Sequence, residues 1–262
     1  MKNKDYWNLR AKKNKQTIKS TTNFNLIKEF EISILKYLFE KYLKKKSLKI
    51  LELGCGNGVN LKSLKTIFPK FEFYGIDYSK EMIKHAKKNN NNINFIKADI
   101  TKTNIYNELP KFDVIFTNRC LINLKSENKI NLAISKSEYL LKKGGYFIFL
   151  ENFINGHKNQ NKLRKVLKLR YRKIAKFNKF LDERSFLNLL KKYFKILENV
   201  NYSSLNDLLL YVLTPSNSSK INYNSKLQKK LIFLLINLLE KNKFLLTLNY
   251  NSGQNNLIVC KK

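Results

Sequence analysis

The chain has 262 residues, of which 43% are hydrophobic, and a formal net charge of +33. This length accommodates one large α/β domain or two small ones around a sizeable core. The three cysteines, Cys55, Cys120 and Cys260, form no CxxC pair, which argues against a disulfide framework or a zinc site and suits a reducing cytosol.

The first 22 residues are polar, and we expect them to be irregular. Apolar residues at helical spacing then predict a helix over 26–43. From there to residue 152, short apolar segments typical of strands alternate with amphipathic segments typical of helices. The strands are expected at 48–53, 71–77, 93–99, 112–118 and 146–152, and the helices at 58–67, 79–89 and 126–145, the last closed by Gly144 and Gly145.

This order of elements predicts a doubly wound α/β fold, because short apolar strands joined by helices form a parallel sheet covered on both faces. In such a sheet, ligands bind beyond the carboxyl ends of the strands. Polar residues occur at several of these ends: Glu52, Asp77, Asp99, Asn118 and Glu151.

The rest of the chain has a looser pattern. Helices are expected at 158–176, 183–193, 205–213 and 225–242, strands at 194–202 and 255–262, and loops in the Asn-rich segments 89–92 and 216–225. No apolar segment follows the basic start, so no signal peptide is expected. The longest apolar run, 231–239, has about half the length that spans a bilayer.

The segment LELGCGNG (51–58) follows the first strand and indicates a ligand-binding turn, because glycines let a ligand approach without a Cβ in the way. A dinucleotide fingerprint would need its third glycine at position 59, where the chain has Val59. Glu52 would repel a pyrophosphate beside this turn and attract a cation. The turn residues expected at the ligand are Gly54, Cys55, Gly56 and Gly58.

S-adenosylmethionine is a cationic ligand of this kind, because it carries a sulfonium and an ammonium and no phosphate. Asp77 is expected to accept hydrogen bonds from both ribose hydroxyls, and Asp99 from the adenine amino group. Ile100 and Tyr78 would be apolar walls for the ring. For a single aspartate, a helix N-cap or a turn is the alternative, but here the acidic residues and glycines occur in order at strand ends.

Residues 48–151 resemble a class I (Rossmann-like) SAM-dependent methyltransferase in the segments LELGCGNG, YGIDYS, FIKADI, FDVIFTN and LLKKGGYFIF. The resemblance implies S-adenosylmethionine as the cofactor and a seven-stranded sheet with an antiparallel last strand. The sixth and seventh strands would be 194–202 and 255–262. They are separated here by an insertion of two helices, which departs from the short link of the superfamily and is expected to cover the substrate pocket. We expect a single domain over 1–262, with a helical cap (1–47), a SAM-binding core (48–152) and acceptor-side elements (153–262).

Candidates for catalysis follow the fourth and fifth strands. A hydroxyl acceptor needs a base, whereas an amine needs only to be held as the free base. His157 and Glu151 are the candidates for that base, with an ordinary loop histidine and a helix cap as the alternatives. Arg119 would clamp an anionic group of the substrate or form a structural salt bridge, and Asn118 is expected near the methyl group.

Other residues leave two interpretations open or favour a structural one. Tyr6, Trp7 and Arg10 form an aromatic-basic cluster that either folds over the cofactor or frays. His85 is expected to be solvated on a surface helix. Cys55 and Cys120 are expected to be small packing residues rather than nucleophiles.

We expect a cytoplasmic enzyme that methylates a small molecule and needs no metal. NRCLINL (118–124) and ENFINGHKNQNKLR (151–164) are similar to a bacterial methyltransferase group associated with surface-polysaccharide or small-molecule modification, so a sugar or a cell-envelope precursor is one such acceptor. An RNA or protein methyltransferase is the alternative, disfavoured because Asn118 is not followed by the prolines of base-methylating enzymes. A further alternative is peripheral contact with the inner membrane surface through 226–242.

The net charge of +33 also has two explanations. Lysines are spread along the whole chain, asparagine is abundant and arginine is the minority cation, which indicates A/T-rich coding drift. Attraction to nucleic acid or to an anionic membrane is the alternative. We favour drift.

Overall fold

Seven strands form one sheet in the computed structural model, which describes residues 3–14, 17, 21–22, 25–102, 106–214, 221–223, 225–243, 245–248 and 250–262. They are β1 (Lys49–Leu53), β2 (Glu72–Asp77), β3 (Asn94–Lys97), β4 (Phe112–Asn118), β5 (Leu141–Asn152), β6 (Lys195–Asn201) and β7 (Asn255–Lys261). Their order across the sheet is β3-β2-β1-β4-β5-β7-β6. Only β7 runs antiparallel to its neighbours, so the predicted seven-stranded, mostly parallel fold is confirmed.

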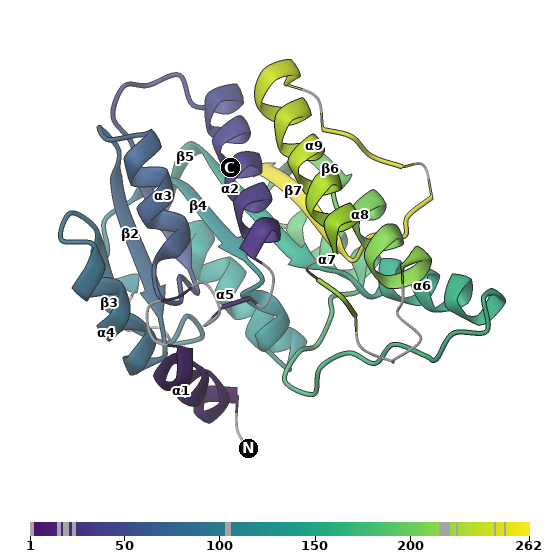
Figure 1. Cartoon of the computed structure of the whole chain (residues 1–262). Coiled ribbons are helices and arrows are strands. Elements are labelled where there is room, and N and C mark those ends of the chain that lie inside the picture. Colours follow the sequence, from purple (N-terminus) through teal and green to yellow (C-terminus); the bar gives the residue numbers. More distant parts are fainter. Residues whose placement is uncertain are drawn as a thin grey trace.

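The helices cover both faces of this sheet. In chain order they are α1 (Asn3–Asn14), α2 (Asn25–Tyr42), α3 (Val59–Ile67), α4 (Lys80–Asn89), the 3₁₀ turn η3 (Leu121–Asn123), α5 (Glu127–Leu140), α6 (Ile154–Val166), α7 (Glu183–Leu190), α8 (Ser204–Leu208), the π-helical turn η4 (Leu209–Leu213) and α9 (Lys226–Asn242). The elements α8, η4 and α9 form the expected insertion between β6 and β7. Figure 1 shows α2 and α9 side by side over one face of the sheet.

Alternation along the buried strands explains the two hydrophobic cores. In β1, Ile50 points into the core under α2, α3 and α9, whereas Leu51 and Leu53 point into the core under α5 and α7. Successive side chains of a strand point to opposite faces, so a strand that is apolar throughout must be covered on both sides. The continuous apolar runs of the sequence therefore require the two helical layers.

The strand register brings three polar positions together at one edge of the sheet. Glu52 lies opposite Gly75 of β2 and Phe116 of β4. Asp77 and Asn118 end β2 and β4, one step beyond the residues that pair with Leu53. The strand order reverses between β1 and β4, which is the position where doubly wound sheets bind ligands.

Three sequence expectations were wrong in detail. Residues 3–14 form α1, although the polar stretch 1–22 was expected to be irregular; of this stretch, 1–2, 15–16 and 18–20 lie outside the described residues. The helix expected at 126–145 ends at Leu140, because the chain turns into β5 before the two glycines. The helix expected at 158–176 begins at Ile154 and ends at Val166.

The segment expected as a loop at 216–225 lies mostly outside the described residues. Helix α9 buries Ile232, Leu235 and Leu239 in the core that it shares with α2. Among the helices that the structure describes, none combines the length and the apolar character that crossing a membrane requires.

Candidate active site

A cavity of about 630 Å³ lies at the carboxyl ends of the central strands. We call the part next to Glu52, Asp77 and Asp99 the β2 side of the cavity. The part next to Asn152 and Asn255, which end β5 and begin β7, is the β7 side. Of the sequence-predicted residues, the cavity wall includes Glu52, Gly54, Cys55, Gly56, Asp77, Tyr78, Asp99, Ile100, Asn118 and Arg119.

The glycine turn forms the floor of the β2 side. Gly54 has a φ of 70°, in the left-handed region that glycine adopts without strain. A Cβ at this position would lie 2.4 Å from Cys120 Sγ. The turn can therefore lie this close to the segment after β4 only because residue 54 has no side chain. The backbone N–H groups of Gly54 and Cys55 both donate to Ile76 O, at 2.7 and 2.9 Å, which ties the turn to the end of β2.

Glu52 is buried on the wall of the β2 side, with 1% of its surface exposed. Its Oε1 accepts a hydrogen bond from Asn60 Nδ2 at 2.5 Å, and its Oε2 has no partner among the described residues. Burial raises the pKa of Glu52 to about 8. A ligand that brings a cation or a hydrogen-bond donor to Oε2 would satisfy this group.

Asp77 is held at the end of β2 by two backbone donors. Its Oδ2 accepts from Gly56 N at 2.9 Å and its Oδ1 accepts from Ser79 N at 2.8 Å. Burial raises the pKa of Asp77 to about 6, and the two backbone hydrogen bonds oppose this rise. Each carboxylate oxygen can accept more than one hydrogen bond, so both oxygens can still accept a ligand hydroxyl.

Asp99, Ile100 and Tyr78 lie together on the same wall. Asp99 is exposed, and its Oδ1 accepts hydrogen bonds from the N–H and the hydroxyl of Thr101, at 2.9 and 2.7 Å. Ile100 is buried and Tyr78 is half-buried. This part of the wall therefore combines an apolar surface with an acceptor at its solvent side, as a planar base with an amino group requires.

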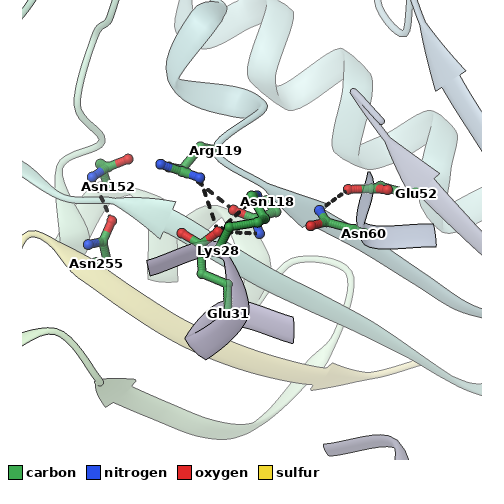
Figure 2. Close-up of polar contacts among 8 residues, drawn as sticks. All are labelled: Lys28, Glu31, Glu52, Asn60, Asn118, Arg119, Asn152 and Asn255. Carbon is green, nitrogen blue, oxygen red and sulfur yellow. Dashed lines mark hydrogen bonds and ion pairs between the residues drawn. The ribbon is translucent and has the colours of Figure 1, made fainter. Parts of the chain in front are cut away.

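A buried ionic cluster lies on the wall between the two sides of the cavity, and Figure 2 shows its members pointing toward one another. Glu31 Oε2 contacts Lys28 Nζ at 2.9 Å and Arg119 Nη2 at 3.0 Å, and it accepts from Asn118 Nδ2 at 2.9 Å. Its Oε1 is buried without a partner among the described residues. Burial alone would raise the pKa of Glu31, but the charges of Arg119 and Lys28 hold it below its ordinary value.

Sequence reasoning missed Lys28 and Glu31. The two residues lie one helical turn apart in α2, beside the apolar stripe, where such a pair is typical of a solvated helix face. The one available signal was the position of α2 just before the first strand. Arg119 was predicted, and it has a φ of 54°, a strained conformation for a residue with a side chain that often occurs at functional sites.

The β7 side of the cavity is lined by amides, a guanidinium and aromatic rings. Asn152 and Asn255, which Figure 2 shows near Arg119, are joined by a 2.6 Å hydrogen bond. Further residues on this side come from the segment after α6, from α8 and η4, and from the position before β7, among them Arg172, Lys173, Asp207, Leu210, Tyr211 and Gln254. None of these was predicted from the sequence.

Helix α1 lies across the mouth of the cavity, next to α4 in Figure 1. Trp7 and Arg10 line the cavity, and Trp7 Nε1 donates to Asn123 Oδ1 at 3.2 Å. The ring of Tyr6 stacks on that of Phe177, with centroids 4.0 Å apart. Of the two interpretations of the aromatic-basic cluster, the structure supports the one in which this segment folds over the site.

Three predicted site residues do not line the cavity. Gly58 has a φ of 79°, and a Cβ there would lie 2.6 Å from Phe95 Cζ. Glycine is therefore needed at this position because a side chain would clash with Phe95 at the start of α3. Glu151 is fully buried and accepts hydrogen bonds from the backbone of Cys120 and Leu121, both at 2.9 Å, so it caps η3. Burial raises the pKa of Glu151 to about 7.

His157 lies behind the cavity wall and is fully buried. Its Nδ1 lies 2.8 Å from Arg172 Nη2 and its Nε2 lies 3.0 Å from Asn161 Nδ2. Burial, assisted by the charge of Arg172, lowers the pKa of His157 to about 4. Both side chains are enclosed by protein and do not line the cavity, so a base at His157 or Glu151 stays a prediction that this geometry does not support.

The comparisons with known proteins agree with this geometry. The profile of a family described as "Methyltransferase domain" matches residues 44–201, more than half of the chain. A malonyl-[acyl-carrier protein] O-methyltransferase of Bacillus cereus is 34% identical over 96 residues, which are 36% of this chain and 35% of that protein. Phosphoethanolamine N-methyltransferase 1 of Zea mays is 29% identical over 150 residues, 56% of this chain and 29% of that protein.

The matches thus span about a third of the length of these curated relatives. Among solved structures, the N-methyltransferase NodS from Bradyrhizobium japonicum, in complex with S-adenosyl-l-homocysteine, superposes with a TM-score of 0.59 and 12% identity. The superposition covers 100% of this chain and 99% of NodS. At this identity the likeness establishes the fold.

Proposed function

Since the chain belongs to the methyltransferase-domain family and is an S-adenosylmethionine-dependent enzyme, we propose that it methylates a small-molecule acceptor bound on the β7 side of the cavity. The two relatives act, by their names, on malonyl-[acyl-carrier protein] and on phosphoethanolamine. The malonyl group is small although a protein carries it, and phosphoethanolamine is a small molecule. The observation that carries the proposal is a pair of buried carboxylate oxygens, Glu31 Oε1 and Glu52 Oε2, which have no partner among the described residues and belong to side chains on the wall of one cavity.

The residues on the β2 side fit S-adenosylmethionine. Asp77 would accept the ribose hydroxyls, and Asp99, Ile100 and Tyr78 would hold the adenine. When bound, the cofactor supplies an electrophilic methyl group on a positively charged sulfur. Glu52 would face the positive part of the cofactor, where a buried carboxylate is favourable because the surroundings screen charges weakly.

The ionic cluster suits the zwitterionic amino-acid end of the cofactor. Lys28 and Arg119 would attract its carboxylate, while the free Oε1 of Glu31 would accept from its ammonium. Asn118 would stay bonded to Glu31 and keep the cluster in register with the end of β4. Orientation of the two reactants is the main contribution that such a protein makes to methyl transfer.

The geometry favours an acceptor that needs no strong base. Neither His157 nor Glu151 reaches the cavity, and both are enclosed by hydrogen-bond partners. A carboxylate or a neutral amine is already nucleophilic, whereas the hydroxyl of a sugar is not. That the acceptor is a sugar or a cell-envelope precursor stays a prediction. On such an acceptor, a carboxylate or an amine would be the favoured site of methylation.

Titration calorimetry with S-adenosylhomocysteine tests the proposal. Asp77→Ala should weaken binding by about 100-fold or more, because it removes two hydrogen bonds to a charged group. Asp113→Ala is the matched control, since Asp113 lies at the amino end of β4 and pairs with Lys142. Unchanged affinity in Asp77→Ala, or equal losses in both variants, would contradict the proposed cofactor site.

Contact with a membrane surface through α9 is a second candidate role. Leu227, Phe233 and Leu234 are 53%, 67% and 50% exposed, and an apolar groove of about 330 Å³ lies between α9 and the α8–η4 segment. Lysines flank this face, as in interfacial helices. Phe233→Ser should reduce sedimentation with phosphatidylglycerol vesicles, whereas Tyr139→Ser, 56% exposed on α5, should not.

A further inference from the structure

Arg172 is held in one position on the β7 side of the cavity. Its backbone N–H donates to Asn161 Oδ1 at 2.8 Å, and its carbonyl accepts from Asn161 Nδ2 at 3.1 Å. Its Nη2 lies 2.8 Å from His157 Nδ1 and donates to Gln160 Oε1 at 2.8 Å and to Gln254 Oε1 at 2.5 Å. The guanidinium carbon lies 4.0 Å from the centroid of the Tyr211 ring. Both the backbone and the side chain are therefore fixed.

The charge of Arg172 has no counter-ion at ion-pair distance within the described part of the chain. Its hydrogen-bond partners are two amides and a histidine that burial keeps neutral, with a pKa lowered to about 4. Arg119 differs, because its Nη2 forms an ion pair with Glu31 Oε2 at 3.0 Å. A half-buried guanidinium whose side-chain hydrogen bonds go to neutral acceptors is an unusual arrangement, since buried charges are normally paired.

Asp207 is the acidic residue on the same side of the cavity, and it is already engaged. Its Oδ2 accepts from Gln254 N at 2.8 Å and from Ser203 Oγ at 3.0 Å. Burial raises the pKa of Asp207, and the nearby charge of Arg172 opposes this rise. The second guanidinium of this region, Arg164, donates to Arg170 O at 2.8 Å and to Tyr211 O. Among the described residues, the β7 side therefore has Arg172 and the exposed Lys173 as its cations, and Asp207 as a carboxyl group with a hydrogen bond on each oxygen.

The hydrogen-bonding capacity of Arg172 is also incomplete. The side-chain hydrogen bonds that Arg172 makes with described residues use Nη2, and its Nε is buried without a partner among those residues. A guanidinium has five N–H donors in a planar fork that matches an oxyanion. Stacking on Tyr211 keeps the plane of this fork in place, so an oxyanion would meet an already oriented partner.

We propose that Arg172 is an oxyanion subsite for the methyl acceptor, which binds a carboxylate or phosphate group of the acceptor away from the atom that is methylated. This inference rests on the proposed function, in that the acceptor occupies the β7 side of the cavity. The inference adds that the acceptor carries an anionic group away from the methylated atom, and that Arg172 selects acceptors with such a group. Asn161, Gln160 and Gln254 are then positioning residues for that guanidinium.

The two histidines of the chain provide a direct test by NMR. Nitrogen-15 spectra of the imidazole rings are recorded while inorganic phosphate or malonate is added at constant ionic strength, with S-adenosylhomocysteine present to fill the β2 side. His157 contacts Arg172, so its resonances should shift and saturate. His85, on α4 among surface lysines, reports non-specific anion binding and should not show the same saturable shift.

Arg172→Gln should weaken the saturable effect by about tenfold or more, and Arg172→Lys should weaken it less, because lysine keeps the charge but loses the fork. Arg170→Gln, an exposed neighbour, should have no effect. Equal shifts of both histidines, no shift of His157, or an unchanged titration in Arg172→Gln would overturn the proposal. Calorimetry with S-adenosylhomocysteine alone decides the proposed function separately and shows whether each variant is folded.

Discussion

Glu52 and Asp77 place two buried carboxyl groups at the site, at a cost in stability. Glu52 and Asp77 are buried side by side at the ends of β1 and β2, and burial is the main cause of the raised pKa values of both. Isolated charges in a protein interior are unfavourable unless they are paired. We infer that these residues serve ligand binding rather than folding, because apolar residues would fill the same positions at lower cost.

The pH dependence of stability follows from the raised pKa of Glu52. Its folded-state pKa of about 8 lies above the unfolded value, so its contribution to stability is complete below about pH 4 and is lost as the pH rises toward 8. Asp77 and Glu151, with pKa values raised to about 6 and about 7, act in the same direction. Glu52→Gln should raise the free energy of unfolding at pH 8 by about 1–3 kcal/mol and flatten the profile between pH 6 and 8.

Urea unfolding of both proteins at several pH values measures this difference. Glu72→Gln is the control, because Glu72 lies at the start of β2 and the hydrogen bond from Tyr74 is the main cause of its lowered pKa. A wild-type pH profile in Glu52→Gln would show that the buried carboxyl group is not the source of the dependence.

The glycine turn supplies a second prediction at the scale of single residues. Gly54→Ala should destabilise the fold by about 2–4 kcal/mol, because its new Cβ would lie 2.4 Å from Cys120 Sγ and its φ is 70°. Gly144→Ala is the control that measures the cost of the left-handed backbone without a steric clash, since Gly144 has a φ of 75° and open space around it. That variant should lose about 1 kcal/mol.

Thermal or chemical unfolding measures both variants, and calorimetry measures cofactor binding. We expect Gly144→Ala to bind S-adenosylhomocysteine as the wild type does. If the two alanine variants were equally stable, close approach of the turn to Cys120 would not explain the glycine at position 54.

At the scale of elements, α1 and α2 bring chain segments from before the first strand into the site. Helix α2 packs its apolar stripe under α9 and on the sheet, and this leaves Lys28 and Glu31 facing the cavity. Helix α1 is rich in polar residues, and Ala11 is its one buried residue among the described side chains of 5–14. Such an element is a candidate for opening and closing, because it buries little apolar surface.

Trp7 is the residue through which α1 contacts both the cavity and η3. Trp7→Ala should weaken S-adenosylhomocysteine binding about tenfold, mainly through faster dissociation, because it removes the hydrogen bond to Asn123 and the ring contact with Phe177. Stopped-flow dissociation measures this change. Leu9→Ala is the control on the same helix, since Leu9 is 56% exposed. Equal dissociation rates for the two variants would contradict a closing role for α1.

At the scale of the whole molecule, the net charge of +33 governs association in solution. If it reflects coding drift, RNA should be retained only at low salt and should not be methylated. A charge-driven, non-specific complex loses affinity steeply as salt rises, so we expect retention to be lost between about 50 and 200 mM salt. Filter binding of a mixed RNA pool at several salt concentrations, with a methylation assay on the same pool, tests this expectation. RNA methylation would favour the alternative function.

The order of elements, the strand ends and the glycine turn could be predicted from the sequence, because each depends on residues that are close together in the chain. Apolar alternation defines a strand, and parallel strands bring their carboxyl ends to one edge. The position of Asp77 and Asp99 beside Glu52 therefore followed from spacing alone. The resemblance to the methyltransferase superfamily rests on these same local segments.

What only the tertiary structure decided is the environment of residues whose partners lie far away in the chain. Glu31 meets Arg119 across 88 positions, and Arg172 meets Gln254 across 82. His157 follows β5, as a base should, but α6 turns it into the protein and away from the cavity. Burial, charge pairing and pKa depend on how helices pack against the sheet, and no local pattern encodes that packing.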